Sequence, residues 1–293
     1  MKTAQSINYQ TLGDKMRYYK KHPFSLLAAI LVGLAALITV CVLFLLVGYI
    51  LIRGIPNITP DLFAWKYTSD NVSMMPAIIN TLTMTGITLI IAVPVGVFSA
   101  IYLVEYAKRG NKIVGLVRMT TETLAGIPSI VFGLFGYLIF VIAMKFGLSM
   151  MSGALTLAIM VLPTIMRTTE EALKAVPDSY REGSFGLGAG RLRTVFRVIL
   201  PSAVPGILSG VILSIGRIVG ETAALIYTSG TVAGIPDNLM GSGRTLSVHM
   251  YALLSEGLHT EEAYATAVVL LIMVILINAL SGFAAKKIQS NKG

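Results

Sequence analysis

The chain has 293 residues, of which 55% are hydrophobic and only 13% are charged. Soluble domains carry about 25% charged residues, so this composition, with a mean hydropathy of +0.78, excludes an ordinary soluble domain and indicates an integral membrane protein. The net charge is +9, and the single cysteine, Cys41, excludes an internal disulfide.

Six stretches are apolar and long enough to cross a membrane, which takes roughly 20 residues. They are residues 24–52, 77–104, 119–144, 148–166, 202–227 and 263–285. The first is too long for a cleaved signal peptide, so we interpret it as a retained span. The sequence therefore predicts an all-α integral membrane protein with six transmembrane helices and tails at residues 1–23 and 286–293.

Lysine and arginine are sorted among the connections between these stretches. They are concentrated in the N-terminal tail, in the connections that follow the second and fourth spans, and in the C-terminal tail. The positive-inside rule places these parts, and so both termini, in the cytoplasm. The basic balance is then a topology signal, so we expect membrane lipid as a partner and no nucleic acid.

Near the start of the third predicted span, Glu122 lies four residues after Arg118. Residues four apart share a helix face, so we expect these two side chains to pair at the cytoplasmic end.

The cytoplasmic connection at residues 176–201 is polar, rich in arginine and interrupted by glycine. Ser179 and Glu182 have the spacing of a capping box, which predicts a short helix at about residues 180–187. Three glycines, Gly186, Gly188 and Gly190, are suited to end that helix, because glycine readily takes the left-handed conformation.

A second, amphipathic helix is predicted directly after this glycine turn. Its apolar face consists of Leu192, Val195, Phe196 and Ile199. A projecting helix braced in this way suits docking into a groove on a cytoplasmic partner. A solvated loop whose arginines meet anionic lipid is the alternative.

At these positions the chain resembles the cytoplasmic signature of ABC-importer membrane subunits, which reads EAA, three residues, Gly, nine residues and I-x-L-P. The matching residues are Glu182, Gly183, Ser184, Gly188, Val198, Ile199, Leu200 and Pro201. Gly183 and Ser184 replace the two alanines, and Val198 replaces isoleucine. The resemblance implies a type I ABC importer permease bundle whose coupling helix contacts an ATPase subunit. The implied contact residues are Ser179, Arg181, Glu182, Gly183, Ser184 and Gly188.

Two further segments, residues 125–136 and 216–223, look like the third and fifth spans of phosphate-importer permeases. The resemblance covers roughly residues 77–285, the expected permease core, and is strongest to the A-type membrane subunit of the phosphate-specific (Pst) importer. It implies a bacterial or archaeal inner-membrane location. It also implies three kinds of partner: a second membrane permease subunit, an ATPase dimer and an extracytoplasmic phosphate-binding protein.

Arg217 and Glu221 are charged residues inside the fifth predicted span. Arg217 lies roughly 22 Å along that helix from its start. One interpretation is an ion pair, since the two residues are four apart on one face. The other is a substrate pathway, in which Arg217 contacts phosphate and Glu221 holds the arginine or accepts a hydrogen bond from protonated phosphate.

The connection at residues 228–262 is predicted to contain a short amphipathic helix. His249 and His259 lie in it without metal-ligand spacing, so we expect both at the surface.

The chain has no G-x-x-x-x-G-K-[ST] loop for ATP, no H-E-x-x-H motif and no cysteine pair. We therefore expect no catalytic residue, no metal site and no cofactor, with ATP bound by the partner ATPase. The leading hypothesis is a non-catalytic permease subunit for inorganic phosphate. One alternative is the same role for another oxyanion or small polar solute. Another is a membrane enzyme or ion-gradient carrier acting alone, which the coupling segment disfavours.

Overall fold

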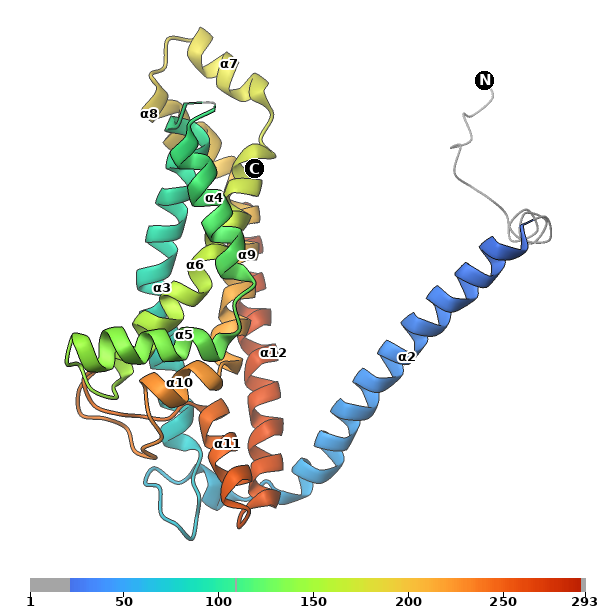
Figure 1. Cartoon of the computed structure of the whole chain (residues 1–293), viewed down its shortest axis with the longest axis vertical. Helices are drawn as coiled ribbons and strands as arrows, with labels where there is room; N and C mark the ends of the chain where they lie inside the picture. The colour runs from blue at the N-terminus through green and yellow to red at the C-terminus, as the bar shows by residue number, and fades with distance from the viewer. Residues whose placement is uncertain (1–21, 109, 291–293) are drawn as a thin grey trace. The chain divides into compact units, whose positions relative to one another are not determined.

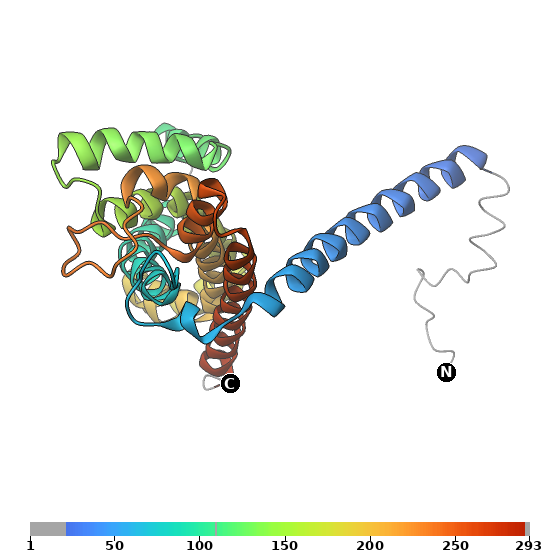
Figure 2. The ribbon, with the colours of Figure 1, turned by 90° about the horizontal axis from the view of Figure 1, so that it is seen from below.

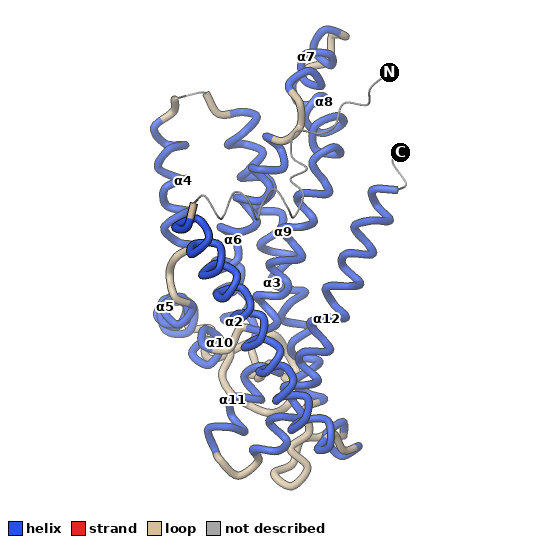
Figure 3. The backbone as a smooth tube through the Cα atoms, turned by 90° about the vertical axis from the view of Figure 1, so that its right-hand side faces the viewer, coloured by secondary structure: helices blue, strands red, loops and turns tan. Residues whose placement is uncertain are grey.

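The computed structural model describes residues 22–108 and 110–290, and over that part the chain folds into helices joined by loops (Figure 3). It divides into two units, residues 1–52 and residues 53–293. The first unit contains most of helix α2 (Pro23–Gly54), whose apolar side chains are largely exposed. Its length and composition suit a membrane span, as the sequence predicted.

The second unit is a bundle of long helices with short helices at both ends (Figure 1). The long helices are α3 (Met75–Ile101), α6 (Met150–Lys174), α9 (Leu200–Gly220) and α12 (Thr260–Ser290). At one end lie α7 (Asp178–Gly186) and α8 (Arg191–Thr194), and towards the other lie α10 (Ala223–Thr228) and α11 (Leu246–Glu256). We call these the α7 end and the α11 end.

The third predicted span is not one helix. It consists of α4 (Lys112–Ala125) and the segment Ser129–Ala143, which begins as α5 (Ser129–Gly136), and the two are bent by 107°. The helix breaks because Pro128 has no N–H to donate and disfavours helical backbone in the residue before it. Figure 2 shows α5 running across the bundle rather than along it. Five helices of the described residues could span a membrane, or six if this bent pair counts as one.

The fifth predicted span differs at both ends. It is continuous from Arg191 to Gly220, because α8 and a π-helical turn, η5 (Val195–Ile199), lead directly into α9. It stops at Gly220, and the last predicted residues of the span form the separate helix α10 instead.

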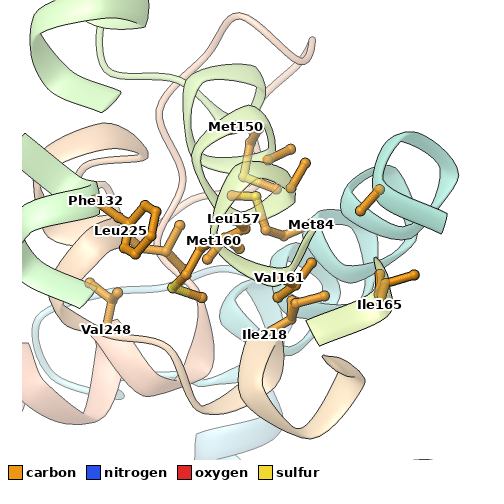
Figure 4. Close-up of a cluster of buried hydrophobic side chains, with 13 residues drawn as sticks. Met84, Phe132, Met150, Leu157, Met160, Val161, Ile165, Ile218, Leu225 and Val248 are labelled. Atoms are coloured by element: carbon orange, nitrogen blue, oxygen red, sulfur yellow. The ribbon is translucent and has the colours of Figure 1, made fainter. Parts of the chain in front are cut away.

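The core of the bundle surrounds α6 (Figure 4). Helix α6 contributes Met150, Leu157, Met160, Val161 and Ile165, all at most 1% exposed. The helices α3, α5, α9, α10 and α11 each add at least one buried residue to the same cluster. Helix α6 thus shares one buried cluster with five other helices of the second unit.

Small residues let α9 approach α6 closely. A Cβ on Gly206 would lie 2.6 Å from the Cβ of Ala172, and one on Gly210 would overlap Thr168. Gly206 and Gly210 are four residues apart, the spacing at which small residues commonly permit close packing of membrane helices. The α6–α9 contact therefore depends on glycine at both positions.

At the α11 end, two polar side chains are buried against an aromatic ring. The Arg244 guanidinium lies 4.6 Å from the centre of the Tyr67 ring, and His249 meets the same ring edge-on at 6.1 Å. His249 is 0% exposed, so the predicted surface location is wrong for this residue. Burial, and then the charge of Arg244, lower the pKa of His249 to about 3.

We predict that Gly210→Leu destabilises the bundle by about 1–3 kcal/mol, because the added side chain has to enter the α6–α9 contact. Thermal unfolding of the purified protein in detergent measures this effect. Gly86→Ala is the control, since no atom lies within 4 Å of a Cβ at Gly86. Equal melting temperatures for the two variants would contradict the assigned packing.

We also predict that stability falls as the pH falls below about 6.5. The folded chain keeps His249 neutral down to about pH 3, whereas the unfolded chain takes up a proton near pH 6.5. Between pH 6.5 and 5 the loss should be about 2 kcal/mol. The melting temperature should change less with pH across this range in His249→Phe than in His259→Asn. His259 is the control because its side chain is partly exposed.

Candidate functional site

Arg217 lies in the last turn of α9 and borders a hollow of about 570 Å³. We call it the Arg217 hollow, and its lining comes from α6, α9 and α12. The lining residues are Thr164, Ser209, Ile212, Leu213, Gly216, Arg217 and Asn278. This set contains one cation and no carboxylate, so the local charge favours an anion.

Glu221 does not pair with Arg217. The helix ends at Gly220, and Glu221 has an extended backbone with φ −71° and ψ 127°. Its carboxylate Oε1 instead accepts a hydrogen bond of 3.1 Å from the N–H of Ala224, at the start of α10. The predicted spacing of four on one helix face is wrong because the helix stops between the two residues.

The Arg217 guanidinium has no hydrogen-bond or ion-pair partner among the described residues. Across the hollow, Asn278 Oδ1 is shielded from water and also has no partner in that part of the chain. Buried polar groups are normally hydrogen-bonded. The Arg217 hollow is therefore lined by a hydrogen-bond donor on α9 and an acceptor on α12, and neither has a partner among the described residues.

A second hollow of about 410 Å³ adjoins the first, since Thr164 and Leu213 line both. We call it the middle hollow. Its charged lining residues are Arg118, Glu122, Arg167, Glu170, Glu171 and Lys174. The Arg118 guanidinium lies 2.6 Å from Glu170 on α6, so the predicted pair of Arg118 with Glu122 is wrong.

A third hollow of about 970 Å³, the α7 hollow, shares Leu103, Arg118 and Lys174 with the middle one. It reaches Arg181 and Phe185 on α7. The three hollows thus lie next to one another, each sharing lining residues with the next, from Arg217 to the α7 end of the bundle.

Helix α7 matches the predicted short helix, but it begins differently. It starts at Asp178 after Pro177, and no side chain caps it. Ser179 is already inside the helix, so the predicted capping box with Glu182 is wrong. Gly188 has a φ of +81° and follows the helix end, as predicted for a glycine stop.

Arg181 turns back from α7 towards the bundle. Its Nη2 lies 2.7 Å from Glu105 Oε1, and the two side chains are only 17% and 8% exposed. Its guanidinium also donates to the backbone oxygens of Val176 and Leu173, each at 2.9 Å. The hydrogen bonds to Glu105 raise the pKa of Arg181 above its ordinary value. Arg181 therefore ties α7 to η3 (Tyr102–Tyr106), the π-helical turn that follows α3.

The other predicted contact residues divide into two groups. The Ser184 hydroxyl lies 2.8 Å from the Thr194 hydroxyl, which braces α7 against α8 from within. Ser179, Glu182, Gly183 and Gly188 are exposed, so their predicted contact with another subunit stays a prediction.

Sequence reasoning missed the apolar surface of this segment. Leu187 is 92% exposed, and four other large apolar or aromatic side chains of this segment are also exposed: Tyr180, Phe185, Leu192 and Phe196. Only Val195 and Ile199 of the predicted apolar face are buried. Spacing could not separate the buried residues from the exposed ones, because Leu192 and Phe196 fit the helical apolar pattern as well as Val195 and Ile199 do. No group of three or more metal-ligating side chains occurs in the described part of the chain.

Comparison with known proteins identifies the family. Residues 92–291 match the family described as binding-protein-dependent transport system inner membrane component. The probable ABC transporter permease protein YqgI of Bacillus subtilis (strain 168) is 33% identical over 287 residues, which cover 90% of this chain and 97% of that protein.

Two phosphate-system relatives align over shorter lengths. The phosphate transport system permease protein PstA 1 of Mycobacterium tuberculosis (strain CDC 1551 / Oshkosh) is 37% identical and covers 69% of this chain and 67% of its own. PstA of Pasteurella multocida (strain Pm70) is 33% identical, with 77% of this chain and 81% of its own covered.

Solved transporters share the fold at lower identity. A bacterial alginate ABC transporter in complex with its alginate pentasaccharide-bound periplasmic protein superposes with a TM-score of 0.65 at 17% identity, covering 93% of this chain and 98% of the other. The inward-facing MetNI methionine ABC transporter gives a TM-score of 0.58 at 21% identity, covering 76% and 99%. The chain therefore belongs to the family of binding-protein-dependent transport system inner membrane components and is the permease subunit of an ABC importer.

Proposed function

We propose that this permease carries inorganic phosphate into the cytoplasm. The observation that supports this most directly is the unpaired Arg217 guanidinium beside a hollow whose lining contains no carboxylate. Guanidinium groups bind phosphate through two parallel hydrogen bonds, which gives both strength and orientation.

The free-energy cost of placing Arg217 inside a membrane span supports a functional role for this residue. An arginine at the centre of a membrane helix costs at least about 2.5–3.5 kcal/mol. A structural ion pair would offset that cost, but Glu221 caps α10 instead. An arriving anion offers the partner that the described residues do not supply.

The relatives favour phosphate over other solutes. The Mycobacterium and Pasteurella proteins are named as phosphate transport system permeases. The solved structures are named for methionine and alginate, so the shared fold does not select the substrate. Another oxyanion or a small polar solute is the alternative.

We further propose the partners that such a subunit needs. They are a second membrane permease subunit, a dimer of ATPase subunits and an extracytoplasmic phosphate-binding protein. ATP would bind to the ATPase, and this chain would contribute neither catalysis nor a cofactor. The α7 end would face the cytoplasm with both termini, and its exposed Tyr180, Phe185 and Leu187 suit the cleft of an ATPase.

The mechanism follows from how α7 is held. Closure of the ATPase dimer on ATP would displace α7, and the ion pair of Arg181 with Glu105 would transmit that displacement to the π-helical turn that follows α3. The bundle would then alternate access to Arg217 between the two sides of the membrane.

Replacing Arg217 tests the substrate assignment. Arg217→Gln should abolish phosphate uptake by the reconstituted complex, because the anion loses its only cation in the Arg217 hollow. Arg217→Lys should retain part of the activity, since lysine keeps the charge but not the paired donors.

The control is Lys66→Gln, which removes an exposed charge elsewhere. Assembly is checked by co-purification of all subunits. Normal phosphate uptake by Arg217→Gln would contradict the proposal. Uptake of a different anion, with phosphate inert, would favour the alternative substrate.

A second test, at α7 and the residue after it, separates contact with the ATPase from packing within the chain. Leu187→Ser should weaken co-purification with the ATPase without changing the melting temperature, because Leu187 is 92% exposed. Arg181→Ala should lower the stability of the chain by about 3–5 kcal/mol, because it leaves Glu105 as an uncompensated buried charge.

The charge-swapped double variant Arg181→Glu with Glu105→Arg should recover part of that loss. An unchanged melting temperature in Arg181→Ala would show that the pair does not brace α7. A lower melting temperature in Leu187→Ser would show that this residue packs within the chain.

A further inference from the structure

Two cations from different helices converge on one carboxylate oxygen in the middle hollow. Arg118 Nη2 of α4 and Lys174 Nζ of α6 each lie 2.6 Å from Glu170 Oε1. The Glu170 side chain is 13% exposed, whereas the side chains of Arg118 and Lys174 are 41% and 53% exposed, so the carboxylate is largely buried and both cations remain accessible. The three groups together carry one net positive charge.

The arginine is only partly used by this contact. Its Nη2 reaches Glu170, while its Nε is closed to water and has no hydrogen-bond partner among the described residues. The Nε and Nη2 groups form the edge of the guanidinium that binds two oxygens of one anion. An orphaned buried donor is unfavourable, and Glu170 leaves this one unsatisfied.

The cluster lies where an anion leaving Arg217 would arrive. The middle hollow shares Thr164 and Leu213 with the Arg217 hollow. It shares Leu103, Arg118 and Lys174 with the α7 hollow. The two cations therefore border both the hollow on the Arg217 side and the one that opens at the α7 end.

We propose that Arg118 and Lys174 form a second anion-binding site for a tetrahedral oxyanion, and that Glu170 occupies this site when no substrate is present. Two oxygens of the anion would take the Nε and Nη2 donors of Arg118, and a third would take Lys174. The Glu170 carboxylate stands in for one substrate oxygen and is displaced on binding. The inference rests on the proposed transport of phosphate, and this would be the second binding site on that pathway.

Displacement of Glu170 has a structural consequence. Helix α4 packs against α6, and its bend of 107° from the following segment leaves it without a straight continuation. The Arg118–Glu170 ion pair links α4 to α6. Substrate that takes Arg118 from Glu170 would therefore loosen α4 as it passes.

Binding of inorganic phosphate to the full membrane complex, without nucleotide or binding protein, tests the site. Glu170→Gln keeps the shape of the side chain but removes the competing charge. It should tighten phosphate binding by about tenfold, because the competent form of the site becomes the dominant one. Adding Arg118→Gln or Lys174→Gln to this variant should abolish the gain.

The site is distinguished from the Arg217 hollow by a further double variant. Arg217→Gln with Glu170→Gln should keep the gain in binding, because the two sites use different cations. Glu256→Gln, an exposed charge at the α11 end, is the matched control and should bind phosphate as the parent does.

Two outcomes would overturn the inference. One is unchanged phosphate binding in Glu170→Gln with an unchanged melting temperature. The other is a gain that survives loss of both Arg118 and Lys174 but vanishes with Arg217. In either case normal phosphate uptake by the parent complex, and its loss in Arg217→Gln, would leave the proposed function standing.

Discussion

The close packing around α6 is the constraint on which the rest of the bundle depends. Helices in lipid gain little from burying apolar surface against one another, so tight van der Waals contact has to supply the association. Gly206 and Gly210 permit that contact on the α9 side. One result is that Thr164 of α6 borders the same hollow as Arg217 of α9. Another is that Glu170, further along α6, reaches Arg118 of α4.

The positions at which helices break determine which polar side chains have a partner within the described part of the chain. Irregular backbone at membrane depth is tolerated where protein buries it or where it lines a cavity. The end of α9 at Gly220 illustrates this, because Glu221 then satisfies the first turn of α10 instead of Arg217. The break before α5 has a similar effect, since it turns the following segment across the bundle and leaves α4 packed on α6. Within the described part of the chain, Arg217 thus lacks a partner as a consequence of backbone geometry.

The spans, the short helix near residues 178–186 and the glycine stop at Gly188 could be predicted, because hydropathy and glycine chemistry are local properties. The helix breaks were missed because proline and glycine also occur within continuous spans, as Pro94 does in α3. The partners of Arg118 and Arg181 could not be found from spacing, since Glu170 and Glu105 lie far away in sequence. The buried location of His249 was missed because its neighbour Tyr67 comes from a distant loop.

The link between α7 and the middle hollow runs along one side of the bundle. Arg181 holds Glu105, which lies two residues after Leu103, and Leu103 borders both the middle hollow and the α7 hollow. A displacement of α7 would therefore act on the wall next to Arg118 and on the end of α6, where the backbone oxygen of Leu173 also accepts a hydrogen bond from Arg181. Cores transmit strain but resist deformation, whereas an ion pair beside a hollow can exchange partners. Coupling by this route would open the exit from Arg217 without repacking the close contact between α6 and α9.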